Sequence, residues 1–325
     1  MKLPRRQLLH LAAGAAALPA LSQIARVQAY PSRPVRMIIG FPAGAGGDIV
    51  ARLMGQWLSD RLGQPVIIEN RPGAGASLGA ESVVRAAPDG YTLLLCSSAD
   101  AINATIYAKL KFNFVRDIAP VASIASGPLV LAVHPSFPAK SVAEFIAYAK
   151  ANPGKVSFGS VGIGTVAHVA GELFKFMTGV NLVHVPYRGA AAALTDLLGG
   201  QVQATFSSVP PAIEHIRTGK LRALAVTSAT RNEALPDLPT IGDFLPGYEA
   251  TLISGLCAPR DTSTEIIGRL NRETTAALAD AGIKAKLADL GNVPLAMTAT
   301  DFGKLIADEM EKWAKVIRGA NIKAQ

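Results

Sequence analysis

The chain has 325 residues, of which 50% are hydrophobic, and a formal net charge of +8 at pH 7. Its Lys and Arg residues form no dense run and are not interleaved with aromatic residues, which argues against a nucleic-acid-binding surface. Its two cysteines are too few for a disulfide framework and have no neighbours at metal-ligand spacing, so no metal site is expected from them.

The N-terminal 29 residues are typical of an export signal. Arg5 and Arg6 precede an apolar run that is shorter than the roughly 20 residues needed to span a bilayer, and residues 27–29 suit cleavage before Tyr30. The paired arginines also resemble a twin-arginine signal, so the export route stays open. Four basic residues and no acid precede the expected cut, which lowers the formal charge from +8 to +4. We therefore expect a periplasmic mature chain that begins at Tyr30.

The mature chain alternates short apolar runs with helical patterns. Strands are expected at 35–40, 66–70, 91–96, 129–134, 156–159, 182–185, 204–206 and 221–226. Between the first two, apolar residues recur every three or four positions from Ile49 to Leu58, and Gly63 and Pro65 end the helix. Further helices are expected near 166–177, 263–281 and 301–318. This alternation predicts parallel α/β sheets.

Each cysteine ends a short apolar run, Cys96 at 91–96 and Cys257 at 252–257. Two interpretations stay open for them. They are either two small buried residues or, in an oxidising compartment, a disulfide.

Three glycine-rich turns, at 41–48, 71–77 and 159–165, follow expected strands and open into amphipathic helices. A helix N-terminus presents unpaired N–H groups and the positive end of the helix dipole, and glycine lets a small anion approach the backbone closely. The turns therefore indicate a carboxylate or phosphate ligand. They would equally serve as tight strand-to-helix connections, in which Asp48 and Thr165 act as helix caps.

After cleavage, 296 residues remain, more than one hydrophobic core usually holds, so two domains are expected. One α/β unit spans 30–127 and a second spans 128–249. The remaining segment, 250–325, is too short for a domain of its own and is expected to return to the first, which gives two chain crossings and a hinged cleft. Ligands of open α/β sheets bind at the carboxyl ends of strands, where all three glycine turns lie.

The motifs indicate neither catalysis nor a cofactor. The glycines at 73–79 echo a dinucleotide fingerprint, but the third glycine is one place late and no Gly-Lys-Ser/Thr phosphate loop exists. His168 and Glu172 lie four residues apart on one helix without an adjacent third metal ligand. There is no Gly-x-Ser-x-Gly elbow, although a triad assembled from separate loops stays open. We predict no catalytic residue, no metal and no cofactor.

A series of short motifs resembles one receptor family. They include Tyr30-Pro-Ser-Arg-Pro34, Phe41-Pro-Ala-Gly44, Glu69-Asn-Arg-Pro-Gly-Ala-Gly75, Ala87-Pro-Asp-Gly-Tyr-Thr92, His184-Val-Pro-Tyr-Arg-Gly189, Gly219-Lys-Leu-Arg-Ala-Leu-Ala-Val226 and Leu235-Pro-Asp-Leu-Pro-Thr240. In this order they are similar to the Bug family, the TctC-like periplasmic solute receptors of tripartite tricarboxylate transporters. The resemblance covers essentially the whole mature chain.

The resemblance implies the α/β fold of a type II periplasmic binding protein, with two lobes, a ligand cleft between them and two chain crossings. It also implies a monomer that closes on a small organic acid, such as a dicarboxylate, a tricarboxylate or an aromatic carboxylate, and hands it to membrane transporter subunits. The alternative is a periplasmic sensor that presents its closed form to a signalling partner. An enzyme acting on a carboxylate is less favoured.

The resemblance further implies that backbone amides and ordered waters of the first glycine turn hold the ligand carboxylate. Phe41 would lie beside the ligand, and Asp48 would order the loop and its waters. The implied ligand-binding positions are Phe41, Ala43, Gly44, Ala45, Gly46, Asp48, Ser77, Ser97, Ser98, Ser160, Gly164, Thr165, His168, Tyr187, Ser207 and Ser208.

One position departs from the family pattern. Relatives commonly carry an aspartate where this chain has Ser207. An acid there would suit a ligand ammonium, whereas a hydroxyl leaves a desolvated ammonium without a charge partner. We therefore predict a carboxylate ligand without an amino group.

Overall fold

The computed structural model describes residues 30–107 and 110–323. In this part of the chain, ten strands are joined in the order β2-β1-β3-β9-β4-β7-β5-β6, with β8 and β10 pairing with β4 outside that path. The strands are β1 (Val35–Ile39), β2 (Val66–Asn70), β3 (Thr92–Ser97), β4 (Ile118–Val133), β5 (Val156–Ser160), β6 (Leu182–Pro186), β7 (Ala204–Ser208), β8 (Arg222–Val226), β9 (Thr251–Pro259) and β10 (Val293–Pro294).

Helices cover the faces of this sheet system. They are α2 (Gly46–Leu62), η1 (Ala74–Ala76), α3 (Ser77–Val84), α4 (Ser98–Ile106), α5 (Phe114–Asp117), α6 (Val142–Ala151), α7 (Val166–Thr178), α8 (Ala190–Leu198), α9 (Val209–Arg217), η2 (Ile241–Asp243), α10 (Thr264–Ala279), α11 (Ala281–Asp289) and α12 (Ala299–Gly319). The helices expected at 263–281 and 301–318 correspond to α10 and α12.

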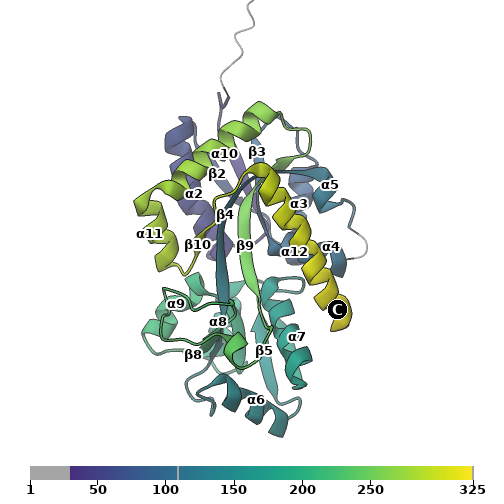
Figure 1. Ribbon diagram of the computed structural model, residues 1–325, viewed down its shortest axis with the longest axis vertical. Helices are drawn as coiled ribbons and strands as arrows, with labels where there is room; N and C mark the ends of the chain where they lie inside the picture. Colours follow the sequence, from purple (N-terminus) through teal and green to yellow (C-terminus); the bar gives the residue numbers. More distant parts are fainter. Residues whose placement is uncertain (1–29, 108–109, 324–325) are drawn as a thin grey trace, which may run out of the picture.

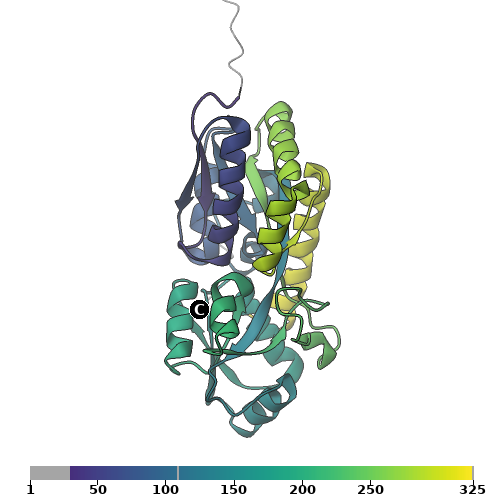
Figure 2. The same ribbon diagram turned by 90° about the vertical axis from the view of Figure 1, so that its left-hand side faces the viewer.

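Two lobes lie one above the other in Figure 1. In the first lobe, β1 pairs in parallel with β2 and β3, and β9 lies antiparallel between β3 and β4. In the second lobe, β5 pairs in parallel with β6 and β7, while β7 and β8 pair antiparallel with the end of β4. The long strand β4 passes from one lobe into the other (Figure 2), and the chain returns to the first sheet in β9. These are the two crossings of a type II periplasmic binding protein.

The expectation of parallel sheets is right for β1–β3 and for β5–β7 but wrong for β4, β8 and β9. The strand expected at 129–134 is only the end of β4, which is 16 residues long. Pro120 and Pro128 hide the rest, because proline lacks the N–H that a strand donates. The β4–β9 register shifts beside Pro120, which lets the strand continue past the proline.

The helices that follow β1 and β5 start and end at local signals. Helix α2 buries Val50, Met54 and Leu58 on one face and ends at Gly63. At the start of α7, the Thr165 hydroxyl accepts a hydrogen bond from the His168 backbone N–H at 3.3 Å. These signals fix where each helix N-terminus lies relative to the end of its strand.

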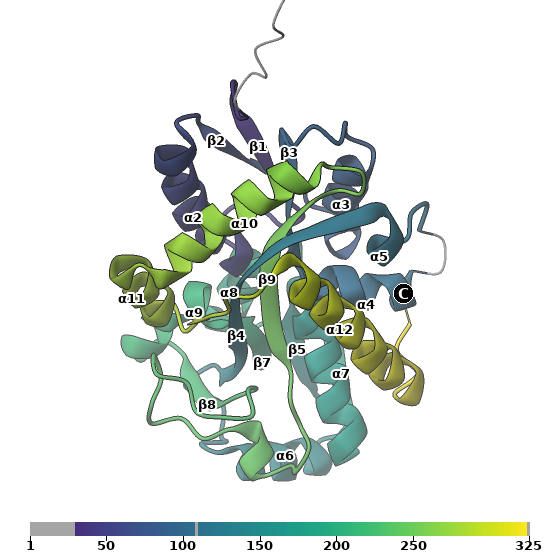
Figure 3. The same cartoon turned by 45° about the horizontal axis from the view of Figure 1, so that its top comes forward.

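Each lobe has an apolar core of its own. In the first lobe, one cluster joins Met37 and Leu93 of the sheet to Leu58 of α2 and Leu270 of α10. Helices α2 and α10 lie side by side over it (Figure 3). In the second lobe, an aromatic cluster packs around Phe158, with other rings from α6, α7 and β7.

Helix α12 contacts both cores. Phe302, near its start, packs against the first lobe with Cys96 and Cys257. Trp313 and Ile317, near its end, belong to the large cluster of the second lobe. Helix α12 also lies beside α4 (Figure 3). The last helix is therefore packed across the junction between the lobes.

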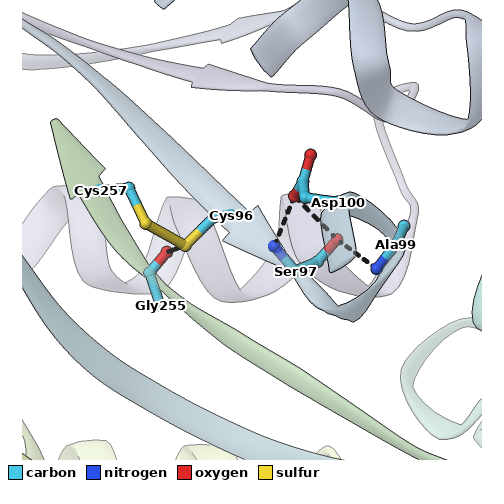
Figure 4. Close-up of a disulfide and its surroundings, with 6 residues drawn as sticks. All are labelled: Cys96, Ser97, Ala99, Asp100, Gly255 and Cys257. Carbon is cyan, nitrogen blue, oxygen red and sulfur yellow. Dashed lines mark hydrogen bonds between the residues drawn. A yellow bond between two sulfur atoms is a disulfide. The ribbon is translucent and has the colours of Figure 1, made fainter. Parts of the chain in front are cut away.

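Cys96 and Cys257 form a disulfide between β3 and β9 (Figure 4). Of the two interpretations left open by the sequence, the disulfide is therefore correct. Their Cα atoms lie 6.2 Å apart, and both residues are buried. The bridge joins positions 161 residues apart in the chain and ties the returning strand to the first sheet.

Candidate ligand-binding site

A cavity of about 520 Å³ lies between the lobes, at the carboxyl ends of four strands. Two of these strands, β1 and β2, belong to the first lobe, and β5 and β6 belong to the second. The lining residues are Gly40, Phe41, Pro42, Pro72, Gly73, Ala74, Gly75, Ala76, Tyr107, Val161, Gly162, Ile163, Pro186, Tyr187 and Arg188. All three glycine-rich turns thus contribute to one cavity.

Each of the four lining segments leads into a helix. The segment after β1 enters α2, the segment after β2 enters α3, and those after β5 and β6 enter α7 and α8. The first N–H groups of a helix have no partner inside the helix, and the helix dipole is positive at that end. The rim of the cavity therefore suits a small anion such as a carboxylate.

Two smaller cavities of about 60 Å³ each lie next to the large one and share Phe41 with it. Both are lined by Phe41, Gly46, Gly47, Ser97, Ser208 and Leu252. One of them also reaches Ala45 and Thr165. Residues of both lobes therefore meet around Phe41 as well as in the large cavity.

The residues implied by the family resemblance fall into two groups. Those lining the cavities between the lobes are Phe41, Ala45, Gly46, Ser97, Thr165, Tyr187 and Ser208. Those outside the lining of these three cavities are Ala43, Gly44, Asp48, Ser77, Ser98, Ser160, Gly164, His168 and Ser207.

Ser98 and Ser207 are each engaged elsewhere. The Ser98 hydroxyl accepts a hydrogen bond from the Ile253 N–H at 2.9 Å, which links α4 to β9. The Ser207 hydroxyl donates to the Ser208 carbonyl at 3.1 Å and is buried. Ser77 is also buried, and its hydroxyl has no hydrogen-bond partner within the described residues.

Ser97 caps α4 (Figure 4) and is also among the residues that line both small cavities. Its hydroxyl accepts from the Ala99 N–H at 3.3 Å, and its own N–H donates to Asp100 at 2.8 Å. Burial raises the pKa of the Asp100 carboxyl to about 7, although the bonds from Ser97 act in the opposite direction.

Asp48 is the organising residue of the first turn. It is 2% exposed, and its carboxylate accepts hydrogen bonds from the Gly44 N–H at 2.9 Å, from Arg52 at 3.0 Å and from Asn70 at 2.9 Å. Burial raises its pKa, but the bonds from Arg52, Gly44 and Asn70 outweigh burial and hold the pKa below its ordinary value. The Asn70 amide also donates to the Phe41 carbonyl at 2.9 Å, so Asp48 fixes the loop that lines the cavity.

The lobes touch at positions where only glycine fits. A Cβ on Gly46 would lie 2.8 Å from the Ser208 hydroxyl oxygen, and a Cβ on Gly75 would lie 2.6 Å from the Ile163 carbonyl oxygen. In both pairs the glycine belongs to the first lobe and its neighbour to the second. Both contacts between the lobes therefore depend on a glycine.

The turn after β5 rests on two stacked histidines. The ring centroids of His168 and His184 lie 4.2 Å apart, and the Ser160 hydroxyl lies 2.7 Å from His184 Nε2. Burial, followed by the charge of Lys175, lowers the pKa of His168 to about 4. Burial, followed by the charges of His168 and Lys175, lowers the pKa of His184 to about 3. Both rings are therefore neutral when the turn is in place.

These depressed pKa values predict a pH-dependent stability. Below the ordinary pKa of 6.5, both histidines bind protons in the unfolded chain, whereas in the folded chain they stay neutral down to about pH 4. Lowering the pH in this range therefore favours the unfolded state. For two groups, the loss between pH 7.5 and 5.5 is roughly 3 kcal/mol. Asp100 acts in the opposite direction, because its raised pKa favours the folded state in this range.

Urea unfolding of wild type and of the double variant His168→Gln/His184→Gln at pH 7.5 and 5.5 measures the histidine contribution alone, because Asp100 is common to both proteins. We expect the stability advantage of wild type over the variant to shrink by roughly 3 kcal/mol at the lower pH. An advantage that is the same at both pH values would show that the two rings are not held neutral.

Three residues in or beside the cavity were not predicted from the sequence. Tyr107 lines the cavity and donates to the Ile163 carbonyl across the lobes at 3.3 Å, and Asn103, which lies behind the lining, donates to the Gly75 carbonyl. Neither stands in a motif, because Asn103 lies on α4 and Tyr107 directly follows it, and both reach the site only through packing. Arg188, by contrast, lies inside the motif His184–Gly189, one residue after the predicted Tyr187.

Among residues 30–107 and 110–323, no group of three or more His, Cys, Asp or Glu side chains is arranged to hold a metal ion. No helix in the same part of the chain is long and apolar enough to cross a membrane. The expected signal, 1–29, lies outside the described residues.

Comparison with known proteins agrees with this geometry. A family model for the tripartite tricarboxylate transporter family receptor matches residues 50–322. BugT from Bordetella pertussis is 38% identical over 299 residues, covering 90% of this chain and 92% of BugT. An R. palustris protein solved with adipate is 35% identical, has a TM-score of 0.88 and is matched over 90% of this chain and 99% of its own. MatC from Rhodopseudomonas palustris, solved with bound malate, is 31% identical, has a TM-score of 0.84 and is matched over 89% of this chain and 100% of its own. The chain belongs to the receptor family of the tripartite tricarboxylate transporters, together with the Bug proteins.

Proposed function

We propose that the mature chain is a periplasmic receptor that binds a small organic carboxylate between its lobes. It then delivers the acid to the membrane subunits of a tripartite tricarboxylate-type transporter. The observation that carries this proposal is the cavity of about 520 Å³, where four segments leading into helix N-termini converge. Two relatives that share more than 30% of their sequence with this chain were solved with adipate and malate, both dicarboxylates.

We further propose that the protein acts as a monomer whose lobes are 30–127 with 250–325, and 128–249. Binding would proceed by closure, in which the acid first engages the amides of one lobe and the other lobe then excludes water. The close approaches of Gly46 to the Ser208 side chain and of Gly75 to the Ile163 carbonyl support closure, because a glycine at each position lets the two lobes come together.

The ligand class is proposed to be a carboxylate without an amino group. None of the described residues that line the large cavity has an acidic side chain. The Ser207 hydroxyl donates its hydrogen bond to the Ser208 carbonyl. A ligand ammonium would therefore lose its water without gaining a charge partner. A ligand carboxylate would instead accept hydrogen bonds from the backbone N–H groups of the glycine-rich turns.

A binding role is also favoured over catalysis by the state of the Ser160–His184 pair near the cleft. Ser160 is 1% exposed, and the His184 Nδ1 atom is buried without a hydrogen-bond partner within the described residues. A catalytic histidine needs a group on that nitrogen to hold its tautomer and to stabilise its charge. The pair therefore supports the turn rather than a reaction.

A thermal-shift screen of residues 30–325 tests the proposal, since a ligand that binds only the folded state raises the melting temperature. The panel contains dicarboxylates, tricarboxylates, aromatic acids and amino acids, with succinate and aspartate as a matched pair. We expect a selective rise for one acid class, and a larger rise for succinate than for aspartate. The absence of any rise, in protein freed of carried-over ligand, would contradict the receptor role, and a larger rise for aspartate would contradict only the ligand class.

A further inference from the structure

Arg188 stands out among the residues that line the large cavity. It lies two residues after the end of β6 and two residues before α8, at the rim formed by the second lobe. Of the described residues that line the cavity, it is the one with a charged side chain, and the others are glycine, alanine, proline, aliphatic and aromatic residues. The positive charge that faces this cavity beyond the helix ends therefore comes from Arg188.

The backbone on both sides of Arg188 is held in place. The Tyr187 N–H donates to the Ser160 carbonyl at 2.9 Å, and the Tyr187 hydroxyl donates to Asp196 at 2.7 Å. On the other side, Gly189 packs so closely on the first lobe that a Cβ there would lie 3.1 Å from Pro42. Arg188 is thus positioned at the seam between the lobes, although its own side chain is exposed.

The guanidinium of Arg188 differs from those of the other arginines near this end of the sheets. Arg52 is paired with Asp48, and both Arg36 and Arg71 are paired with Glu69. Arg188 makes no hydrogen bond and no ion pair with any described residue. An arginine fork matches the two oxygens of a carboxylate, and that role is open here.

We propose that Arg188 binds a second acidic group of the ligand and thereby selects dicarboxylates over monocarboxylates. This inference rests on the proposed function, in which the N–H groups of the glycine turns hold the first carboxylate. The two binding elements differ in chemistry, because the turns are part of the backbone whereas Arg188 is a side chain that substitution removes. Loss of Arg188 therefore affects only those acids that carry a second carboxylate.

The test compares adipate with hexanoate, which has the same six carbons but a methyl group in place of the second carboxylate. Calorimetry on residues 30–325 gives the affinity of each acid for wild type, Arg188→Gln, Arg188→Lys and Arg318→Gln. Arg318 is an exposed arginine near the end of α12, outside the cavity lining, and serves as the matched control. Melting temperatures of all four proteins report on folding.

We expect Arg188→Gln to weaken adipate binding by about tenfold and to leave hexanoate binding unchanged. Arg188→Lys keeps the charge but loses the fork, so it should fall between wild type and Arg188→Gln for adipate, and Arg318→Gln should match wild type. If wild type binds these acids and Arg188→Gln changes both affinities equally or neither, the inference is wrong while the receptor function stands. If wild type binds no carboxylate at all, the receptor function fails and the inference fails with it.

Discussion

Replacing Asp48 with alanine is expected to weaken carboxylate binding by about 10- to 100-fold. The buried carboxylate of Asp48 accepts hydrogen bonds from the Gly44 N–H, the Arg52 guanidinium and the Asn70 amide. Without it, these donors lose their acceptor and the turn from Phe41 to Asp48 loses its fixed shape. A turn that must be ordered by the ligand binds more weakly, because part of the interaction free energy is spent on the ordering.

The effect of Asp48→Ala is separated from a general loss of stability by two further measurements. The control Asp60→Ala changes the same residue type on the same helix, but the Asp60 side chain is exposed and accepts a hydrogen bond only from Gln56. The Asp60→Ala variant should therefore bind the carboxylate with the affinity of wild type. Thermal unfolding shows how much of each variant is folded at the temperature of the binding assay. Equal affinities of folded wild type and folded Asp48→Ala would remove Asp48 from the site.

Removing the disulfide with Cys96→Ala/Cys257→Ala is expected to lower the free energy of unfolding by about 2 to 5 kcal/mol. The bridge closes a loop of 161 residues, and the chain-entropy model gives about 5 kcal/mol for a loop of that size. Alanine suits both positions because each is buried against apolar residues, with Phe302 among them. The loss arises mainly in the unfolded state, where the β9 segment is no longer tied to β3.

Urea unfolding with and without a reducing agent provides the control for this prediction. Reduction should lower the stability of wild type toward that of the double variant and should leave the double variant unchanged. Wild type and variant with the same unfolding midpoint under non-reducing conditions would show that the bridge contributes nothing to stability.

Much of the fold follows from local patterns in the sequence. The spacing of apolar residues in α2 and α7, with Gly63 and Thr165 at their ends, places both helices from residues alone. The path of β4 does not, because Pro120 and Pro128 interrupt its pattern and only the partner strand β9 makes the segment a strand. Pairing between distant segments of a chain leaves little trace in either segment by itself.

The site divides in the same way. The glycine turns were recognisable because a turn between a strand and a helix has a local signature, and the structure brings all three to one cavity. Asn103 of α4 and Tyr107, which directly follows it, were missed because this segment has no motif and reaches the cavity region only through packing. The pairing of the cysteines depended on their separation in space, which sequence spacing does not give.

The most direct measurement is a crystal structure of residues 30–325 bound to the acid that gives the largest thermal shift. The account predicts one carboxylate of that acid between the lobes, within hydrogen-bond distance of backbone N–H groups in the turns at 41–48 and 159–165. If the acid carries a second carboxylate, that group should face Arg188. An acid bound outside the cleft would contradict the proposal that the glycine-rich turns form the receptor site. An acid bound inside the cleft without contact to either turn would contradict it as well.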